Sequence, residues 1–242
     1  MGEAIVITSG KGGVGKTTTT ANVGTSLALL GKKVCLIDTD IGLRNLDVAM
    51  GLENRIIYDL VDVIEGRCKI NQALVKDKRF DGLLYLLPAA QTSDKHSITP
   101  EQMKKLVTEL KQDYDYIIID CPAGIEQGFK NAVAGADKAI VVTTPERTAV
   151  RDADRIIGLL EKEEHIESPK LVINRIRGHM MDNGDMLDID EITTHLSIDL
   201  IGITQKKHNE ITEKLNLDED MPILYNYGTY FENKLIVNLL IC

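Results

Sequence analysis

The chain has 242 residues, of which 43% are hydrophobic and 27% charged, and 28 basic against 37 acidic side chains give a formal net charge of −9. This length suits one α/β domain with a sizeable core. The acidic balance argues against a nucleic-acid-binding protein, because phosphate backbones require a basic surface.

No signal peptide precedes the first apolar run, and no run approaches the ~20 residues of a membrane-spanning helix, so we expect a cytoplasmic protein. The four cysteines, at positions 35, 68, 121 and 242, show no metal-ligand spacing. Cys35 and Cys121 fall in apolar, strand-like segments. We interpret them as reduced core residues rather than metal ligands or redox thiols.

Short apolar runs alternate along the chain with amphipathic segments. Strands are predicted at residues 4–8, 34–37, 83–87, 116–119, 139–143, 171–173 and 200–203. Helices are predicted over 17–30, ended by Gly31, over 101–111, started by Pro100, and over 150–160. Continuous apolar strands are typical of a parallel sheet buried on both faces. We therefore expect one domain over 1–242, an α/β fold with a doubly wound, mostly parallel sheet flanked by helices.

A phosphate-binding loop follows the first predicted strand and opens the first predicted helix. Its sequence matches G-x-x-x-x-G-K-[ST], and the candidate nucleotide-binding residues are Gly10, Lys11, Gly12, Gly13, Val14, Gly15, Lys16, Thr17 and Thr18. Glycines let backbone N–H groups turn toward phosphate oxygens, and the helix adds its positive dipole end. We expect Lys16 to reach the β- and γ-phosphates of ATP and the Thr17 hydroxyl to bind Mg²⁺.

Lys11 is a second lysine in this loop, directly after its first glycine. The ordinary phosphate cradle does not need it. Spacing alone leaves two readings equally open: a solvated loop lysine, or a residue that reaches a phosphate held by another subunit.

Acidic residues follow two of the predicted strands, where ligands bind in doubly wound folds. Asp38 and Asp40 end the second strand, and Asp120 ends the very apolar run 116–119. Residues two apart in an extended chain point the same way, so both Asp38 and Asp40 can face the nucleotide. Asp120 is typical of a Mg²⁺ ligand, and a neighbouring carboxylate can orient the attacking water. Asp38 also fits a turn or helix-cap residue.

Three stretches together resemble a known family. The loop from Lys11 to Thr18 is similar to the deviant Walker A motif, which partition ATPases of the ParA type, iron–sulfur carriers and nitrogenase iron proteins share. Residues 38–47 (DTDIGLRNLD) and 120–126 (DCPAGIE) resemble the MinD family of septum-placing ATPases, as do 51–55 and 150–155. The resemblance extends to about Ile203 and is greatest to members of the Bacillus type.

The resemblance implies an ATP-bound homodimer with Mg²⁺-ATP at its interface. Lys11 would contact phosphates of the opposite subunit, and Lys16 and Thr17 would hold phosphate and metal. Asp40 would position the attacking water, with Asp38 and Asp120 on the metal side. Asn174 and Arg175, which follow a predicted strand, match the base-contacting pair of the family; from the sequence alone they also fit a strand-end turn.

The resemblance also implies partners at the inner face of the cell membrane. The ATP-bound dimer would recruit a MinC-like division inhibitor, and MinE or a polar adaptor would supply the spatial cue. Arg151, Asp152 and Asp154, on one predicted helix, match positions linked to the inhibitor surface. Without the resemblance they read as a solvated helix face.

The chain departs from the family pattern after Ile203. Residues 204–207 read TQKK where the family has a proline and acids, so we do not expect the family's adenine contact from this loop. Members of the family end in a basic amphipathic helix that binds membrane, whereas residues 231–242 contain one lysine. We predict a last core-packing helix or strand there, with a membrane anchor as the alternative, and therefore ATP binding with impaired membrane recruitment.

Three rival functions remain at this level. A DNA-partition ATPase would need a basic C-terminal part, but charges from 204 onward are mostly acidic. An iron–sulfur carrier would need paired cysteines, which the spacing does not provide. An ATP-binding scaffold without turnover is the third, and phosphate release distinguishes it from an active ATPase.

Overall fold

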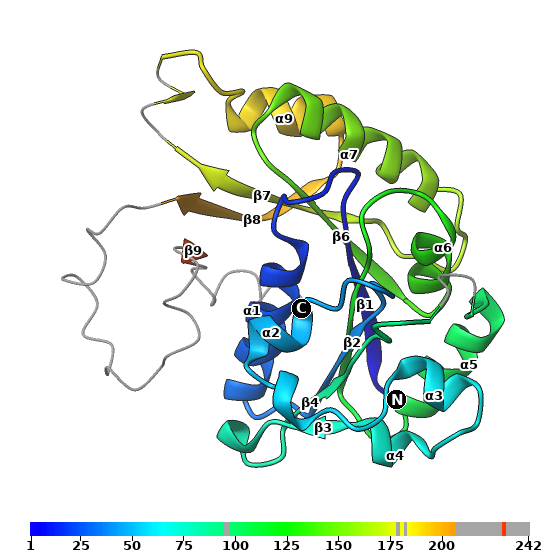
Figure 1. Cartoon of the computed structure of the whole chain (residues 1–242). Helices are drawn as coiled ribbons and strands as arrows, with labels where there is room; N and C mark the ends of the chain where they lie inside the picture. Colours follow the sequence, from blue (N-terminus) through cyan, green and yellow to red (C-terminus); the bar gives the residue numbers. More distant parts are fainter. Residues whose placement is uncertain (94–96, 178–179, 182, 207–228, 231–242) are drawn as a thin grey trace.

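The computed structural model describes residues 1–93, 97–177, 180–181, 183–206 and 229–230 (Figure 1). The terminal run 231–242, for which we predicted a core-packing element, lies outside the described residues, as does Lys207. Within the described part of the chain, no helix is both long and apolar enough to cross a membrane.

The core of the molecule is a nine-stranded sheet, ordered β3-β4-β2-β5-β1-β6-β7-β8-β9. Its strands are β1 (Glu3–Thr8), β2 (Val34–Asp38), β3 (Val75–Lys76), β4 (Leu84–Leu87), β5 (Tyr116–Asp120), β6 (Lys138–Thr143), β7 (Lys170–Ile176), β8 (Asp199–Lys206) and β9 (Thr229–Tyr230). Adjacent strands run parallel except for the pairs β3–β4 and β8–β9. All seven predicted strands are present.

The described helices follow the strands in the chain. They are α1 (Lys16–Leu29), α2 (Leu46–Met50), α3 (Leu60–Ile64), α4 (Ile70–Ala73), α5 (Pro100–Leu110), α6 (Gln127–Ala134), α7 (Arg147–Leu160) and α9 (Ile189–Leu196), with 3-10 turns η1 (Glu53–Arg55) and η2 (Lys78–Phe80). The three predicted helices correspond to α1, α5 and α7. Periodicity missed the others because four to eight residues are too few to establish a repeat of 3.6.

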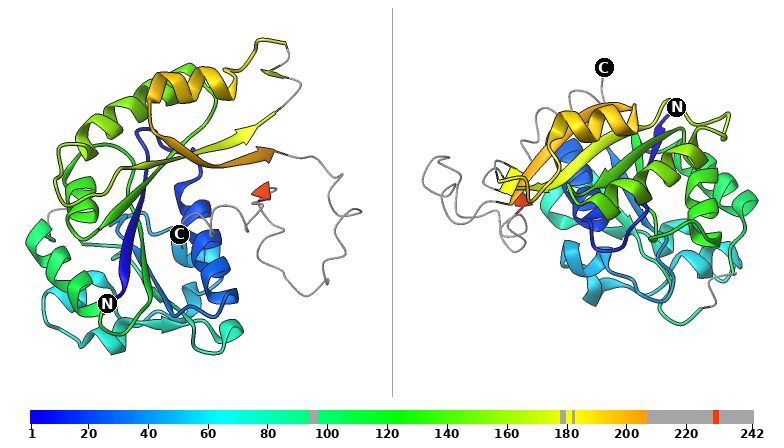
Figure 2. Two further views of the ribbon diagram at one scale, coloured as in Figure 1. Left: turned by 180° about the vertical axis from the view of Figure 1, so that it is seen from behind. Right: turned by 90° about the horizontal axis from the view of Figure 1, so that it is seen from above.

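Helices cover both faces of the sheet, as the continuous apolar strands predict (Figure 2). One core packs α5, α6, α7 and α9 on one face, and the other packs α1 and α2 on the opposite face. Alternate residues of a single strand enter different cores: Leu171 and Ile173 of β7 belong to the first, and Val172 belongs to the second. The doubly wound α/β architecture expected from the sequence is therefore confirmed.

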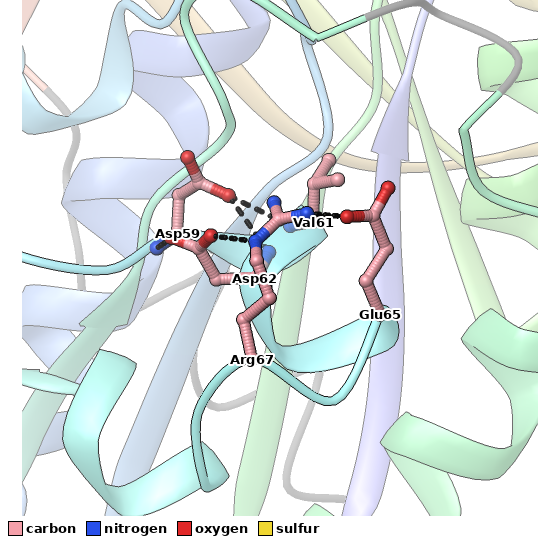
Figure 3. A network of polar contacts seen from close by, with 5 residues as sticks. All are labelled: Asp59, Val61, Asp62, Glu65 and Arg67. Atoms are coloured by element: carbon pink, nitrogen blue, oxygen red, sulfur yellow. Dashed lines mark hydrogen bonds and ion pairs between the residues drawn. The ribbon is translucent and has the colours of Figure 1, made fainter.

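The short helix α3 is held by polar contacts at its ends (Figure 3). The Asp59 carboxylate accepts hydrogen bonds from the backbone N–H groups of Val61 and Asp62, and the Asp62 carboxylate accepts one from the N–H of Asp59 at 3.0 Å. Arg67 donates to Asp62 at 2.6 Å and forms an ion pair with Glu65. Such a capping box supplies partners for N–H groups that a five-residue helix otherwise leaves free.

Cys35 and Cys121 are buried, free thiols, as predicted. Burial raises the pKa of both, which keeps them protonated and unreactive. Cys121 lies one residue beyond β5 rather than within the strand. Cys242 lies outside the described residues.

Candidate functional site

The phosphate loop lies where the strand order reverses. β1 sits between β5 and β6; the strands leading away on one side are β2, β4 and β3, and on the other side β7 and β8. The loop after β1 therefore leaves the sheet at its topological switch point, where doubly wound folds bind ligands. The strands β2, β5, β6 and β7 end at the same edge of the sheet as β1. The loops that follow them therefore bring the candidate residues together there.

The loop backbone is shaped to receive phosphate oxygens. Gly13 and Gly15 have φ angles of 76° and 105°, a region that L-residues with side chains rarely adopt. No atom outside the adjoining residues lies within 4 Å of the Cβ position of Gly13, so the loop has free space at this point. The first turn of α1 has no acidic residue and Gly15 provides no side-chain cap. Its N–H groups and positive dipole end are available to an anion, which fits a nucleotide phosphate.

Lys16 is held against the loop rather than extended into solvent. Its side chain is only 8% exposed, and its Nζ donates a hydrogen bond of 3.0 Å to Ser9 Oγ. Ser9 Oγ in turn donates to the carbonyl of Lys11 at 2.8 Å. Ser9 was missed by the sequence analysis, although it directly precedes the motif. The lysine charge is thus placed beside the open cradle by a fixed hydrogen-bond chain.

Asp38 and Asp120 form a buried carboxyl pair at the ends of β2 and β5. Their Cα atoms are register partners, and the residues are 1% and 3% exposed. Asp38 accepts hydrogen bonds from the N–H groups of Asp40 and Leu46, at 2.9 and 3.1 Å. Asp120 accepts one from Thr20 Oγ1 at 3.2 Å. Thr20 is a further contact that the motif did not indicate.

Burial dominates the ionisation of this pair. Loss of water raises the pKa of Asp38 to about 6, although two backbone hydrogen bonds act in the opposite direction. Burial, followed by repulsion from Asp38, raises the pKa of Asp120 to about 7, while Thr17, Lys16 and Thr20 lower it. Burial and mutual repulsion both make it difficult to ionise the two carboxyl groups at once. A bound cation would offset the lost hydration and the repulsion, so the pair favours cation binding.

The donor set fits Mg²⁺ only in company with phosphates. Asp38, Asp120 and the hydroxyl of Thr17, which hydrogen-bonds to Asp120, supply oxygen ligands at one place. Among the described residues, no group of three or more His, Cys, Asp or Glu side chains is arranged to hold a metal. Mg²⁺ normally combines one or two carboxylates with substrate phosphates and water. This edge of the sheet suits that arrangement.

Asp40 lies two residues beyond Asp38 and is partly exposed, as a group that meets solvent and substrate should be. It borders a cavity of about 50 Å³, which Thr39, Pro122 and Ala123 also line. This volume admits water but not a nucleotide. The cavity is therefore of a size for water beside Asp40, and no residue of the phosphate loop lines it.

Lys11 has partners within its own chain. Its Nζ lies 3.0 Å from Glu146 Oε2 and 3.2 Å from Thr148 Oγ1. These residues stand at the start of α7, just after β6. Neither residue was predicted from the sequence. Both follow a strand that borders β1, and polar residues after such strands tend to lie at the ligand site, so their position was a usable signal.

The helix with the predicted partner residues packs directly against the phosphate loop. Arg151 and Asp154 of α7 are exposed, and Asp152 is partly exposed. A Cβ at Gly10 would lie 2.1 Å from the carbonyl oxygen of Asp152, so glycine is required for this contact. The three residues share one helix, as expected, and that helix touches the nucleotide site.

The prediction that Asn174 and Arg175 follow a strand is wrong: both lie within β7, which continues to Ile176. Asn174 is 2% exposed, and its Nδ2 donates a 2.6 Å hydrogen bond to the carbonyl of Val14. Arg175 is exposed. The apolar run ends at residue 173, but hydrogen bonding to the loop and to β8 lets the strand continue through polar residues.

Comparison with known proteins agrees with this geometry. A family model described as an AAA domain matches residues 2–173. The chain is 80% identical over 203 residues to the septum site-determining protein MinD of Bacillus subtilis (strain 168), covering 84% of this chain and 76% of the relative.

Two solved structures are also similar. One is a MinC:MinD cell division protein complex of Aquifex aeolicus, with a TM-score of 0.78 and 53% identity over 87% of this chain and 84% of that one. The other is MinD complexed with Mg-ADP from Pyrococcus horikoshii OT3, with a TM-score of 0.75 and 29% identity over 86% of this chain and 82% of that one.

Proposed function

This chain belongs to the MinD family of septum site-determining ATPases, and on that basis we propose that it is a two-subunit switch driven by Mg²⁺-ATP. It is a P-loop ATPase that acts in placing the division septum. The observation that most directly supports Mg²⁺-ATP as the ligand is the gathering of Lys16, Asp38 and Asp120 around the glycine loop. A DNA-partition role is not favoured, because the relatives of high identity are septum-site proteins.

The proposed binding step uses the loop backbone and Lys16. N–H groups from Gly12 to Lys16 would bind the β- and γ-phosphate oxygens, and Lys16 would exchange its bond with Ser9 for one to phosphate. A bound Mg²⁺ would neutralise phosphate charge. Asp38, Asp120 and Thr17 would hold it, and burial keeps the two carboxyl groups in place before it arrives.

The proposed hydrolytic step depends on Asp40. Its backbone N–H donates a hydrogen bond to Asp38, one of the proposed metal ligands, and the residue borders a cavity that admits water, which supports this role. A carboxylate in this position accepts a hydrogen bond from water and directs the oxygen toward the γ-phosphorus. Asp40 would therefore act on turnover rather than on nucleotide affinity.

Lys11 is proposed to act across the dimer, on the phosphates of the partner. To do so it must leave Glu146 and Thr148 of its own chain. Its side chain is 40% exposed and that of Glu146 is 55% exposed. An exposed ion pair of this kind contributes only about 0.2–1 kcal/mol, so phosphate can replace it at little cost.

Helix α7 is proposed as the surface for a MinC-like division inhibitor. Arg151, Asp152 and Asp154 present charge of both signs on it, and the similar Aquifex protein forms a complex with MinC. Since α7 also contacts Gly10, binding there can respond to the state of the nucleotide. Peripheral location at the inner membrane face is what the family resemblance implies, whereas impaired recruitment is the prediction for this chain; control by MinE or a polar adaptor is a further part of the proposal.

Phosphate release and dimerisation test the proposal together. We expect the full chain with Mg²⁺-ATP to release phosphate steadily and to elute as a dimer, and with ADP as a monomer. Lys11→Ala should keep monomeric nucleotide binding and lose the dimer. Lys162→Ala, which replaces an exposed lysine beyond α7, should change neither.

ATP-dependent sedimentation with vesicles containing anionic lipid measures membrane recruitment. A chain that binds ATP but stays monomeric at all concentrations contradicts the switch.

A further inference from the structure

Strand β7 contains a bulge at the point where it faces the phosphate loop. Ile173 pairs with Ile203 of β8 and Ile176 pairs with Gln205, so Asn174 and Arg175 together lie opposite the single residue Thr204. Arg175 has a φ of 63°, so the chain adopts a left-handed conformation at this irregularity. A bulge redirects a side chain, and here it directs Asn174 toward the loop between β1 and α1.

Thr204 is fully buried and makes two hydrogen bonds to this bulge. Its Oγ1 accepts from the backbone N–H of Arg175 at 3.2 Å and donates to Asn174 Oδ1. A valine of the same shape would leave both of those groups without a partner in a dry environment. The threonine hydroxyl therefore determines how the Asn174 amide is oriented.

The opposite end of that amide holds the phosphate loop. Asn174 Nδ2 donates to the carbonyl of Val14 at 2.6 Å. A carbonyl can only accept, so the NH₂ group must face Val14 and the oxygen must face Thr204. A Cβ on Gly15 would lie 2.1 Å from this nitrogen, which shows how closely the amide approaches the loop backbone.

We propose that Thr204 is a positioning residue for the nucleotide phosphates, acting through Asn174 on the carbonyl of Val14. Glycines at 12, 13 and 15 give the loop many alternative conformations. A tie at Val14, in the middle of them, restricts the loop to the form whose N–H groups converge. The inference rests on the proposed phosphate site, and assigns to Asn174 a role on the phosphate side.

The test compares Thr204→Val with Thr204→Ser in the full chain, using a fluorescent ATP analogue and inorganic tripolyphosphate as ligands. Thr204→Val should raise both dissociation constants by roughly 3- to 10-fold, which is the effect expected from losing one or two hydrogen bonds. The KM for ATP should rise similarly, with kcat changed less than twofold. Thr204→Ser keeps the hydroxyl and should restore wild-type binding.

A double-mutant cycle separates action through Asn174 from a general loss of stability. In the Asn174→Leu background, Thr204→Val should weaken tripolyphosphate binding by less than 1.5-fold, because the amide it orients is gone. If Thr204→Val does not fold, Asn174→Leu alone must show the loss of ligand affinity that is predicted for Thr204→Val. Wild-type tripolyphosphate affinity in both variants, or a loss confined to the ATP analogue, overturns the inference. If the wild-type chain binds neither ligand, the proposed phosphate site itself fails.

Discussion

Asp38 and Asp120 face each other in register at the ends of β2 and β5, two carboxyl groups removed almost completely from water. Within the described part of the chain, backbone N–H groups and hydroxyls rather than basic side chains donate hydrogen bonds to them. The arrangement favours a bound cation and is unfavourable when both groups are ionised without one. Stability and metal binding are therefore linked at this pair.

The metal-free protein should lose stability as pH rises through the titration of this pair. In the unfolded chain both carboxyls ionise near 3.8, whereas in the folded protein their pKa values are about 6 and about 7. Between these limits the folded state binds more protons, so the free energy of unfolding falls as pH increases. We expect a fall on the order of 1–3 kcal/mol between pH 5 and 7.5, measured by urea denaturation in EDTA.

Asp120→Asn provides the matched test of that pH dependence. It keeps an oxygen for Thr20 but removes one charge and its repulsion of Asp38, so the fall in stability should become markedly smaller. The exposed Asp154→Asn should leave it unchanged. Equal slopes for the wild type and Asp120→Asn would exclude this pair as the origin.

Lys16→Ala should abolish useful nucleotide binding while leaving the fold intact. Its ammonium group is buried beside the open loop, and charge-assisted bonds to phosphate contribute enough to weaken binding roughly 10- to 100-fold when lost. Titration with Mg²⁺-ADP in a calorimeter measures this loss. Lys162→Ala removes an exposed lysine and serves as control; an affinity for Lys16→Ala within twofold of the wild type contradicts the prediction.

Asp40→Ala should bind Mg²⁺-ATP normally and fail to hydrolyse it. Removal of a group that orients the attacking water typically lowers kcat by about 10²- to 10⁴-fold. Single-turnover phosphate release, with nucleotide affinity measured in parallel, separates the two steps. Asp113→Ala, an exposed acid in the turn that precedes β5, should retain full activity. Equal turnover by Asp40→Ala and the wild type would rule out the proposed role.

Gly15→Ala should destabilise the protein and disrupt the loop. The φ of 105° is strained for alanine by about 1–3 kcal/mol, and the added Cβ would also meet Asn174 Nδ2. Gly158→Ala makes the same change inside α7, where nothing lies within 4 Å, and should stabilise by about 0.5–1 kcal/mol. Chemical denaturation of both variants checks the opposite signs. A Gly15→Ala protein as stable as the wild type would show that the loop can readjust.

Local pattern was enough to predict much of the fold, because burial on both faces of a parallel strand leaves a continuous apolar run. Residues 116–119 and 139–143 are examples. The same pattern predicted that the strand now seen as β7 ends at residue 173, since Asn174 and Arg175 look like the start of a turn. What keeps them in the strand is hydrogen bonding to Thr204 and Val14, 30 and 160 residues away in the chain. No local pattern contains that information.

Glycine spacing and strand-end position are local properties, so the phosphate loop, the acids that follow the strands and the family were predictable from the sequence. Which side chains meet depends on the fold: Ser9 with Lys16, Glu146 with Lys11, and Asp38 beside Asp120. Strand order sets these contacts, since β5 and β6 lie against β1 despite more than a hundred residues between them. The ionisation of the carboxyl pair follows from the same packing, because burial is a property of the assembled sheet.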